Sequence, residues 1–326
     1  MQSGSLRRGV VLVALIGALA IAGAAAILFD RSQLEPAPSE CKGVDVPSGS
    51  DLQQVIDQHA ASTTFCLAEG TFRVSTPLLP REGTQLIGAG IDKTYLEGTG
   101  AEIIIDAKGS AGVLIAHMDI SGARGNPRCR PSCGSGFRGG RDNTVEFVRL
   151  HDNVNHGIGG SEQGLVVANS ILDHNGSRPF TGCCAGGIKG GIGFTIRASE
   201  VFANIGNGIW CDSGCPGGME AIGNTIFDNT RSGIRYEVSW GGATVSDNVI
   251  NSNDRSGDPG AHAGIAVIAS RNALITRNTI GDNNGHAIVV RDTPRGASEN
   301  VRIERNEILG QTIDGCGAEV TCIDNR

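Results

Sequence analysis

Residues 187–239 read GIKGGIGFTIRASEVFANIGNGIWCDSGCPGGMEAIGNTIFDNTRSGIRYEVS. One unit recurs within this stretch. A Gly-Ile pair opens a short alternating run, and an apolar segment followed by Asn closes it. The pair stands at Gly187-Ile188, Gly208-Ile209 and Gly233-Ile234. Self-similarity at a short period is typical of repeat proteins, in which like units stack on one another.

The same unit can be followed outward in both directions. The Gly-Ile pair returns at 157–158 and 264–265, and as Ala-Ile at 287–288. Successive copies are roughly 21 to 31 residues apart, which is the length of one solenoid repeat. Each copy holds short β-branched runs and Gly or Asn corners, without helical periodicity. The pattern predicts an all-β right-handed parallel β-helix with about nine coils between Ile103 and Ile308.

Asparagines recur at one corner of this repeat. They stand at Asn204, Asn229, Asn253 and Asn283. We expect their amides to form a ladder in which each side chain bonds to the coils above and below it.

The first residues have the pattern of an exported chain. Arg7 and Arg8 precede an uncharged apolar run at 9–29, which at about 1.5 Å per residue is long enough to cross a bilayer as a helix. An uncleaved signal-anchor and a cleaved signal peptide both remain open, the latter with Ala24-Ala25-Ala26 as a cleavage site. Both place the following residues outside the cytoplasm, either anchored in the membrane or secreted.

The rest of the chain divides into three segments. Residues 30–40 are predicted to be a linker, residues 41–100 an N-terminal cap with the first coils, and residues 101–326 the β-helix itself. Within the cap, residues 51–59 have apolar side chains at helical spacing, with Ser50 or Asp51 as the N-cap. A cap is expected because an open solenoid end exposes its core and unpaired strand edges.

Composition supports this location and limits the partners. Ten cysteines suit an oxidising exterior, and 49 glycines suit many tight corners. A formal net charge of −7 makes nucleic acid an unsuitable partner, and we expect a monomer. Cys41 and Cys66 are predicted to form a disulfide. Disulfides are also preferred over a zinc site at Cys129, Cys133, Cys183 and Cys184, because the spacing matches no common zinc module, and no metal ligands are assigned.

Two rows of outward side chains follow from the repeat. If the repeated Ile residues point inward, the residues one and three positions later point outward, with coils about 4.8 Å apart. The first row is Gly159, Lys189, Trp210, Arg235, Ala266 and Val289, and the second is Ser161, Gly191, Asp212, Glu237, Ile268 and Arg291. The patch formed by Lys189, Trp210, Asp212, Arg235 and Glu237 is therefore expected on three consecutive coils.

This patch carries the candidate chemistry. An exposed Trp210 would stack on a sugar ring, and Asp212 and Glu237 would lie near the roughly 5 to 5.5 Å separation of retaining glycosidases. Two such carboxylates would raise the pKa of one of them and so create a proton donor. The alternative is a surface ion-pair ladder without a chemical role. His156 and His174 are candidates to reach the patch from neighbouring rows, although a lone corner histidine is more often structural.

The motifs GGIKG, GIWCD, GIRYEVS and DNVINSN, with GSDLQQVID and TTFCLAEGTFR in the cap, are familiar. Over residues 41–326 the sequence resembles the bacterial right-handed parallel β-helix repeat proteins of the pectate-lyase-like superfamily. That resemblance implies that Lys189, Trp210, Asp212 and Glu237 are the functional positions. It does not extend to the paired motifs of polygalacturonases, since Gly285-His286-Ala287 lacks their last glycine, or to the Asp-Pro-His-Glu motif of alginate epimerases.

Two functions from different classes remain open. The first is an enzyme acting on a polysaccharide, with Lys189, Asp212 and Glu237 catalytic and with Trp210, Arg235, Arg291 and His156 binding substrate. Asp212 and Glu237 would act in a hydrolase, whereas Lys189 would be the base of a lyase, with Ca²⁺ as a possible aid and no other cofactor. The second is a non-catalytic cell-surface module that binds a glycan or a protein.

Overall fold

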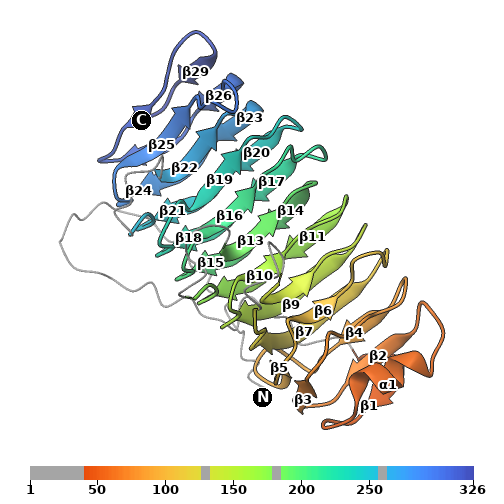
Figure 1. Cartoon of the computed structure of the whole chain (residues 1–326). Helices are drawn as coiled ribbons and strands as arrows, with labels where there is room; N and C mark the ends of the chain where they lie inside the picture. Colours follow the sequence, from red (N-terminus) through yellow and green to blue (C-terminus); the bar gives the residue numbers. More distant parts are fainter. Residues whose placement is uncertain (1–39, 126–132, 178–184, 256–262) are drawn as a thin grey trace, which may run out of the picture. The chain divides into compact units, whose positions relative to one another are not determined.

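The computed structural model describes residues 40–125, 133–177, 185–255 and 263–326. These residues form a parallel β-helix in which every pairing between named strands is parallel and joins one coil to the next. The strands form three ladders that run along the axis of the stack, and the third ladder begins only at residue 103 (Figure 1). The predicted all-β parallel fold is confirmed.

The first ladder begins at the N-terminal end of the stack. Its strands, in pairing order, are β1 (Val44–Val46), β2 (Thr64–Leu67), β4 (Gln85–Ile87), β7 (Leu114–Ser121), β9 (Thr144–His151), β11 (Leu165–Ala168), β14 (Phe194–Arg197), β17 (Met219–Ile222), β20 (Ala243–Ser246), β23 (Arg271–Thr276), β26 (Glu299–Glu304) and β29 (Val320–Ile323).

The second ladder shares β7 and β9 with the first. Its other strands are β3 (Gly70–Val74), β5 (Thr94–Gly98), β12 (Ile171–Asp173), β15 (Glu200–Phe202), β18 (Thr225–Phe227), β21 (Val249–Asn251), β24 (Thr279–Gly281) and β27 (Glu307–Leu309). Sharing is possible because β7 and β9 are eight residues long and bend at His117 and Phe147, whose φ angles are 57° and 51°.

The third ladder has nine strands, in agreement with the number of coils expected from the Gly-Ile repeat. They are β6 (Ile103–Asp106), β8 (Ser135–Arg138), β10 (His156–Gly159), β13 (Gly186–Gly190), β16 (Asn207–Cys211), β19 (Ile234–Glu237), β22 (Ala263–Ile268), β25 (His286–Arg291) and β28 (Ile313–Asp314). Figure 1 shows β10 to β25 of this ladder side by side.

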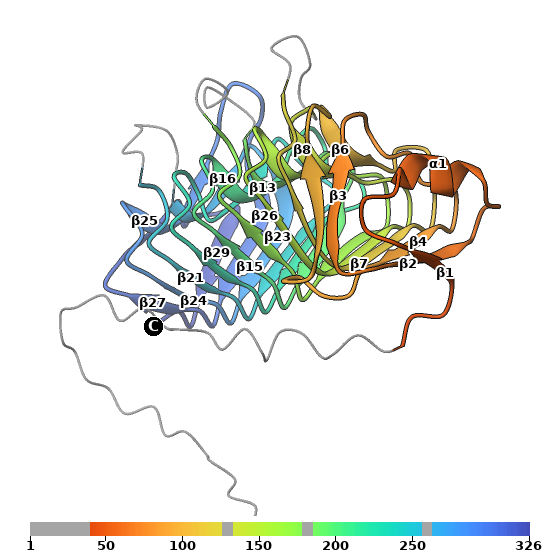
Figure 2. The same ribbon diagram turned by 90° about the horizontal axis from the view of Figure 1, so that it is seen from below.

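The core is a continuous column inside the coils. The repeated Ile side chains point inward as predicted, and Ile188, Ile209 and Ile234 are each at most 1% exposed. At the N-terminal end lies α1 (Leu52–Asp57), close to β1 and β2 (Figure 2). It is shorter than the predicted 51–59 helix. Asp51 is its N-cap and accepts a hydrogen bond from the Gln54 amide (3.0 Å), while Leu52 and Ile56 pack into the core.

The predicted asparagine ladder is confirmed and is longer than expected. Each side-chain Nδ2 donates to the side-chain oxygen of the residue on the next coil, at distances of 2.9 to 3.2 Å. The series runs through Asn153, Asn175, Asn204, Asn229, Asn253, Asn283 and Gln311. A second series comprises Asn224, Asn248, Asn278, Asn306 and Asn325. These amides join successive coils from Asn153 to the C-terminal end of the stack.

Three disulfides lie within the described residues. They join Cys41 to Cys66, as predicted, Cys211 to Cys215, and Cys316 to Cys322. Cys133 is also disulfide-bonded, which excludes it as a zinc ligand, while Cys129, Cys183 and Cys184 lie outside the described residues. Several disulfides in one chain suggest an extracytoplasmic protein.

The apolar run at 9–29, expected to be an anchor or signal, lies outside the described residues. Among the residues that are described, no helix has the length and apolar character needed to cross a membrane.

We predict that Asn229→Ala lowers the free energy of unfolding by about 3 kcal/mol, because the Asn204 amide groups and the Val201 carbonyl oxygen would lose buried partners. The exposed Asn284, which does not have a left-handed backbone, is a matched control. Asn284→Ala should cost less than about 0.5 kcal/mol. Equal urea midpoints for the two variants would show that the ladder does not stabilise the stack.

Candidate functional site

The outer face of the third ladder carries the predicted rows in the predicted register. The first row pairs Gly159 with Lys189, Lys189 with Trp210, Trp210 with Arg235, Arg235 with Ala266, and Ala266 with Val289. In the second row Glu237 pairs with Ile268, and Asp212 follows β16 directly. The structure therefore brings Lys189, Trp210, Asp212, Arg235 and Glu237 together on β13, β16 and β19. We call these five residues the charged cluster.

Each carboxylate of the charged cluster has a cation beside it. The Lys189 ammonium lies 3.0 Å from Asp212 Oδ2. The Arg235 guanidinium forms a bidentate pair with Glu237, at 2.9 and 3.0 Å. These four side chains are only 13% to 15% exposed. The cluster is thus a largely buried group of ion pairs and differs from a ladder of ion pairs on a fully solvated surface.

Trp210 occupies the centre of the cluster but is not the open platform expected from the sequence. Only 6% of the residue is exposed, because the Lys189 ammonium lies over the ring, 3.7 Å from its centroid. Its indole Nε1 is buried and has no hydrogen-bond partner within the described ranges. The prediction of an exposed sugar platform at Trp210 is therefore wrong.

Glu237 departs from the acid–base expectation in a definite direction. Burial raises the pKa of Glu237, but the Arg235 hydrogen bonds and the charges of Arg235, Arg295 and Lys189 outweigh it and leave that pKa below its usual value. Glu237 is therefore an ionised carboxylate at neutral pH. It can accept a proton or stabilise positive charge, and it is unsuited to be the proton donor of a hydrolase in the free protein.

His156 lies one coil before Lys189, on β10. Burial, together with the Lys189 charge, lowers the pKa of His156 to about 3, so the ring is neutral at physiological pH. Both ring nitrogens are buried, and neither has a hydrogen-bond partner in the described part of the chain. The ring adjoins Gly159, where a Cβ would come within 3.2 Å of Nδ1. The structure thus places His156 beside the cluster, without contact to solvent.

Arg291 belongs to the predicted second row but lies away from the cluster. Ile268, which is 2% exposed, separates it from Glu237 in that row. Its guanidinium lies 2.5 Å from Asp314. The structure does not bring Arg291 together with the charged cluster.

A second group of ionisable residues, which sequence reasoning missed, lies on the second ladder. Arg149 donates to both oxygens of the fully buried Asp173 at 2.8 and 2.9 Å, and His151 Nε2 lies 2.9 Å from Asp119. His174, which the sequence made a candidate for the cluster, instead contacts Asp173 at 2.7 Å. The sequence does contain a signal for this group. Leu150-His151-Asp152 and Leu172-Asp173-His174 occupy the same corner on successive coils.

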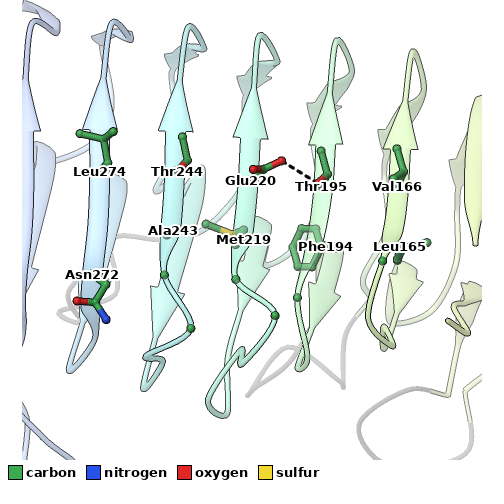
Figure 3. Close-up of a pocket in the computed structure, with 16 residues that line it drawn as sticks. Leu165, Val166, Phe194, Thr195, Met219, Glu220, Ala243, Thr244, Asn272 and Leu274 are labelled. Atoms are coloured by element: carbon green, nitrogen blue, oxygen red, sulfur yellow. Dashed lines mark hydrogen bonds between the residues drawn. The ribbon is translucent and has the colours of Figure 1, made fainter. Parts of the chain in front are cut away.

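A groove without any of these residues lies elsewhere, over the first ladder. It has a volume of about 470 Å³, and Figure 3 shows its lining side chains on successive strands. Glu220 is the one ionisable residue of its lining, and it accepts a hydrogen bond from Thr195 (3.0 Å). None of the predicted site residues lines this groove. We therefore place the candidate site at the charged cluster, where ionisable groups meet.

No group of three or more His, Cys, Asp or Glu side chains is arranged to bind a metal ion in the residues that the structure covers.

The comparisons with known proteins agree with this architecture. Residues 188–326 match the family model described as the right-handed beta helix region. This match covers less than half of the chain and agrees with the parallel β-helix fold that the strand pairing shows. No curated protein matches its sequence.

Solved structures resemble this β-helix protein at low sequence identity. The mannuronan C-5 epimerase A-module of Azotobacter vinelandii is 17% identical, with a TM-score of 0.61 over 88% of this chain and 93% of that chain. The polygalacturonase of Erwinia carotovora ssp. carotovora is 11% identical, with a TM-score of 0.57 over 88% and 98%. An alpha-1,3-glucanase catalytic unit from Streptomyces thermodiastaticus is 13% identical, with a TM-score of 0.52 over 89% and 69%. These likenesses show the parallel β-helix fold.

The second-ladder group predicts a pH dependence of stability. Burial lowers the pKa of His151, but the hydrogen bond and charge of Asp119, with Asp152, outweigh it and leave the pKa raised. The stabilisation by protonated His151 is therefore complete below about pH 6.5 and is lost as the pH rises through the folded-state pKa. We expect His151→Asn to reduce the difference in melting temperature between about pH 5.5 and about pH 8.5.

His59 is the control for this experiment, because its ring contacts a backbone carbonyl oxygen, that of Val55 (2.8 Å), whereas the His151 ring contacts a carboxylate. His59→Asn should keep the pH dependence of the parent protein. If His151→Asn also keeps it, the Asp119 pair does not hold the proton.

Proposed function

We propose that this protein is an extracytoplasmic, polysaccharide-active β-helix protein whose site is the charged cluster on β13, β16 and β19. The observation that carries the proposal is the concentration of four charged side chains, each no more than 15% exposed, on three consecutive coils. Largely buried ionisable groups that meet in one place, with the pKa of one of them shifted as for Glu237, are typical of functional sites. The solved structures with this fold include an epimerase, a polygalacturonase and a glucanase, all named for polysaccharide substrates.

The energetics favour a chemical role over a structural one. Removing charges from water costs several kcal/mol per ion, and replacing a buried pair by apolar residues is often neutral or stabilising. The same outer face shows such a replacement at Ala266, Ile268 and Val289, which form a buried apolar cluster on β22 and β25. The ion pairs on β13 to β19 are therefore not needed to hold the ladder together.

The charge balance points to an acidic polysaccharide. Three cations, Lys189, Arg235 and Arg295, act on Glu237, against the two carboxylates of the cluster. The carboxylate of a uronate sugar would take the place of Glu237 as the partner of the two arginines. Arg235 and Arg295 would then neutralise the uronate, which is the role that Ca²⁺ would otherwise fill in a lyase.

An elimination reaction fits these groups better than hydrolysis. Glu237 is held ionised in the free protein, so it does not supply the proton that a hydrolase needs. In the elimination, Lys189 leaves Asp212 when the uronate binds and gives its ammonium proton to bulk water. The neutral amine then accepts the proton next to the uronate carboxyl group, and the electron pair of that C–H bond forms a C=C bond as the glycosidic C–O bond breaks. The departing oxygen takes up a proton from water, which balances the proton released in the first step.

A non-catalytic binding module is the second candidate. It is favoured by the fact that both carboxylates of the cluster already have cationic partners in the free protein. Such a module would bind the same acidic glycan through exchange of these partners, without bond cleavage.

Mass spectrometry of the products separates the candidates. We expect the purified protein to release unsaturated uronate ends from polygalacturonate, alginate or hyaluronan, with or without added Ca²⁺. Lys189→Gln should lower this rate by about 100-fold or more, because the proton acceptor is lost. Lys93→Gln is the control, since exposed Lys93 pairs with Glu69 at 3.0 Å in the N-terminal coils.

Each other result has a definite meaning. Products that have gained water would establish a hydrolase and overturn the elimination. Binding without products would support the module. If the protein neither binds nor cleaves any of these uronate polymers, the proposed function is overturned.

A further inference from the structure

A second pocket begins where the charged cluster ends. It has a volume of about 280 Å³ and is lined by Val238, Ser239, Trp240, Arg271, Arg295 and Gly296, among others. Val238 follows Glu237 directly in the chain. The charge of Arg295 also contributes to the lowered pKa of Glu237. The pocket and the cluster are therefore neighbours and share one cation.

Trp240 provides the aromatic surface that Trp210 does not. It is 59% exposed, against 6% for Trp210. On one side its ring rests on Gly214, where a Cβ would come within 2.8 Å of Cζ2 and 3.0 Å of Cη2. Gly214 has a φ of +102°, a conformation that glycine tolerates. The indole is thus supported from one side and leaves a large surface open.

A short covalent loop holds this support in place. The disulfide between Cys211 and Cys215, both fully buried, closes a loop that contains Gly214. Gly214 donates its amide to the Val238 carbonyl oxygen (2.8 Å), and Trp240 donates its amide to the Gly214 carbonyl oxygen (3.0 Å). Two backbone hydrogen bonds therefore fix the segment 238–240 to the disulfide loop.

Arg295 lies in an equally well-defined turn. Thr293 and Gly296 exchange two backbone hydrogen bonds of 3.0 Å, and the Arg295 amide donates to the Thr293 hydroxyl oxygen at 3.1 Å. Asp292 closes the loop by accepting a hydrogen bond from the Ser298 amide (2.7 Å). The turn thus fixes the backbone from which the Arg295 side chain extends, and a planar guanidinium can pair with both oxygens of a carboxylate.

The backbone between the cluster and the pocket is strained. Val238 has a φ of 45°, which is a rare conformation for a β-branched residue. Ala269, which follows Ile268, the partner of Glu237 on the next coil, has the same conformation with a φ of 48°. The left-handed corner therefore recurs from coil to coil and directs the chain from Glu237 to Ser239 and Trp240.

We infer that the pocket between Trp240 and Arg295 is a subsite for a further uronate residue of the polysaccharide, next to the residue at the charged cluster. The indole face packs against the C–H groups of the sugar ring, and the guanidinium forms paired hydrogen bonds with the uronate carboxylate. Arg271 adds positive charge at the wall, where its exposed pair with Glu299 (3.2 Å) is weak. The inference rests on the proposed function and names the substrate class of that same site.

Fluorescence quenching and calorimetry test the subsite, because the chain has two tryptophans and Trp240 is the exposed one. Bound oligogalacturonate, oligoalginate or hyaluronan fragments should protect Trp240 from acrylamide. Trp240→Ala and Arg295→Gln should each weaken binding about tenfold. Trp240→Phe should keep most of the affinity, since an aromatic face remains. Neutral cello-oligosaccharides should bind weakly and respond little to Arg295→Gln.

The matched control is Arg81→Gln, because Arg81 is an exposed arginine that bonds to the cap residues Asp57 and His59. It should leave uronate affinity unchanged.

Uronate binding that is equally strong in the parent protein, Trp240→Ala and Arg295→Gln would overturn the subsite and leave the proposed function standing. Uronate binding that depends on Trp240 and Arg295, without any cleavage, would support the subsite and overturn the elimination. Absence of binding to all three uronate probes would overturn the subsite together with the proposed function. Loss of affinity in Trp240→Phe equal to that in Trp240→Ala would overturn ring stacking.

Discussion

Register between coils is the constraint on which this structure depends. Every strand pairs in parallel with the equivalent strand of the next coil, and the buried asparagine amides repeat the same one-coil step through their side chains. A slip by one residue would turn the inward Ile side chains to the outer face and break the amide ladder together with the backbone pairing. The core and the polar ladders thus specify the same register.

The candidate site is a direct product of this register. Lys189, Trp210 and Arg235 are 21 and 25 residues apart in sequence but stand in one row across β13, β16 and β19. The coils hold the charged side chains of the cluster together in a largely buried environment. An unpaired charge would be costly there, and each carboxylate has a cation beside it. Substrate binding at such a site has to proceed by exchange of ionic partners.

The sequence predicted the features that depend on the spacing of the repeat. The fold, the inward Ile column, the asparagine ladder and the alignment of Lys189, Trp210 and Arg235 all follow from counting along the Gly-Ile repeat. Features that depend on side-chain conformation could not be read in this way. The burial of Trp210 results from where the flexible Lys189 side chain lies, and the direction of the Glu237 pKa results from cations on two other segments.

Loop geometry accounts for what the sequence analysis missed. Trp240 and Arg295 stand outside the repeat, and their positions depend on the Val238 backbone, the loop closed by Cys211 and Cys215 and the turn at 293–296. The group around His151 and Asp173 was missed for a different reason. It spans the long strands β7 and β9, which belong to two ladders at once and break the simple period.

The one-coil step of the amide ladders also limits how this protein can evolve. An inserted or deleted residue within a coil is tolerated where it enlarges a corner loop, whereas a change in the ladder strands must come as a whole coil. Duplication of the coil that carries Trp210 would move Lys189 and Arg235 apart by about 4.8 Å while leaving the core intact. Substrate spacing in this lineage can therefore change in discrete steps, through gain or loss of coils, without a redesign of the fold.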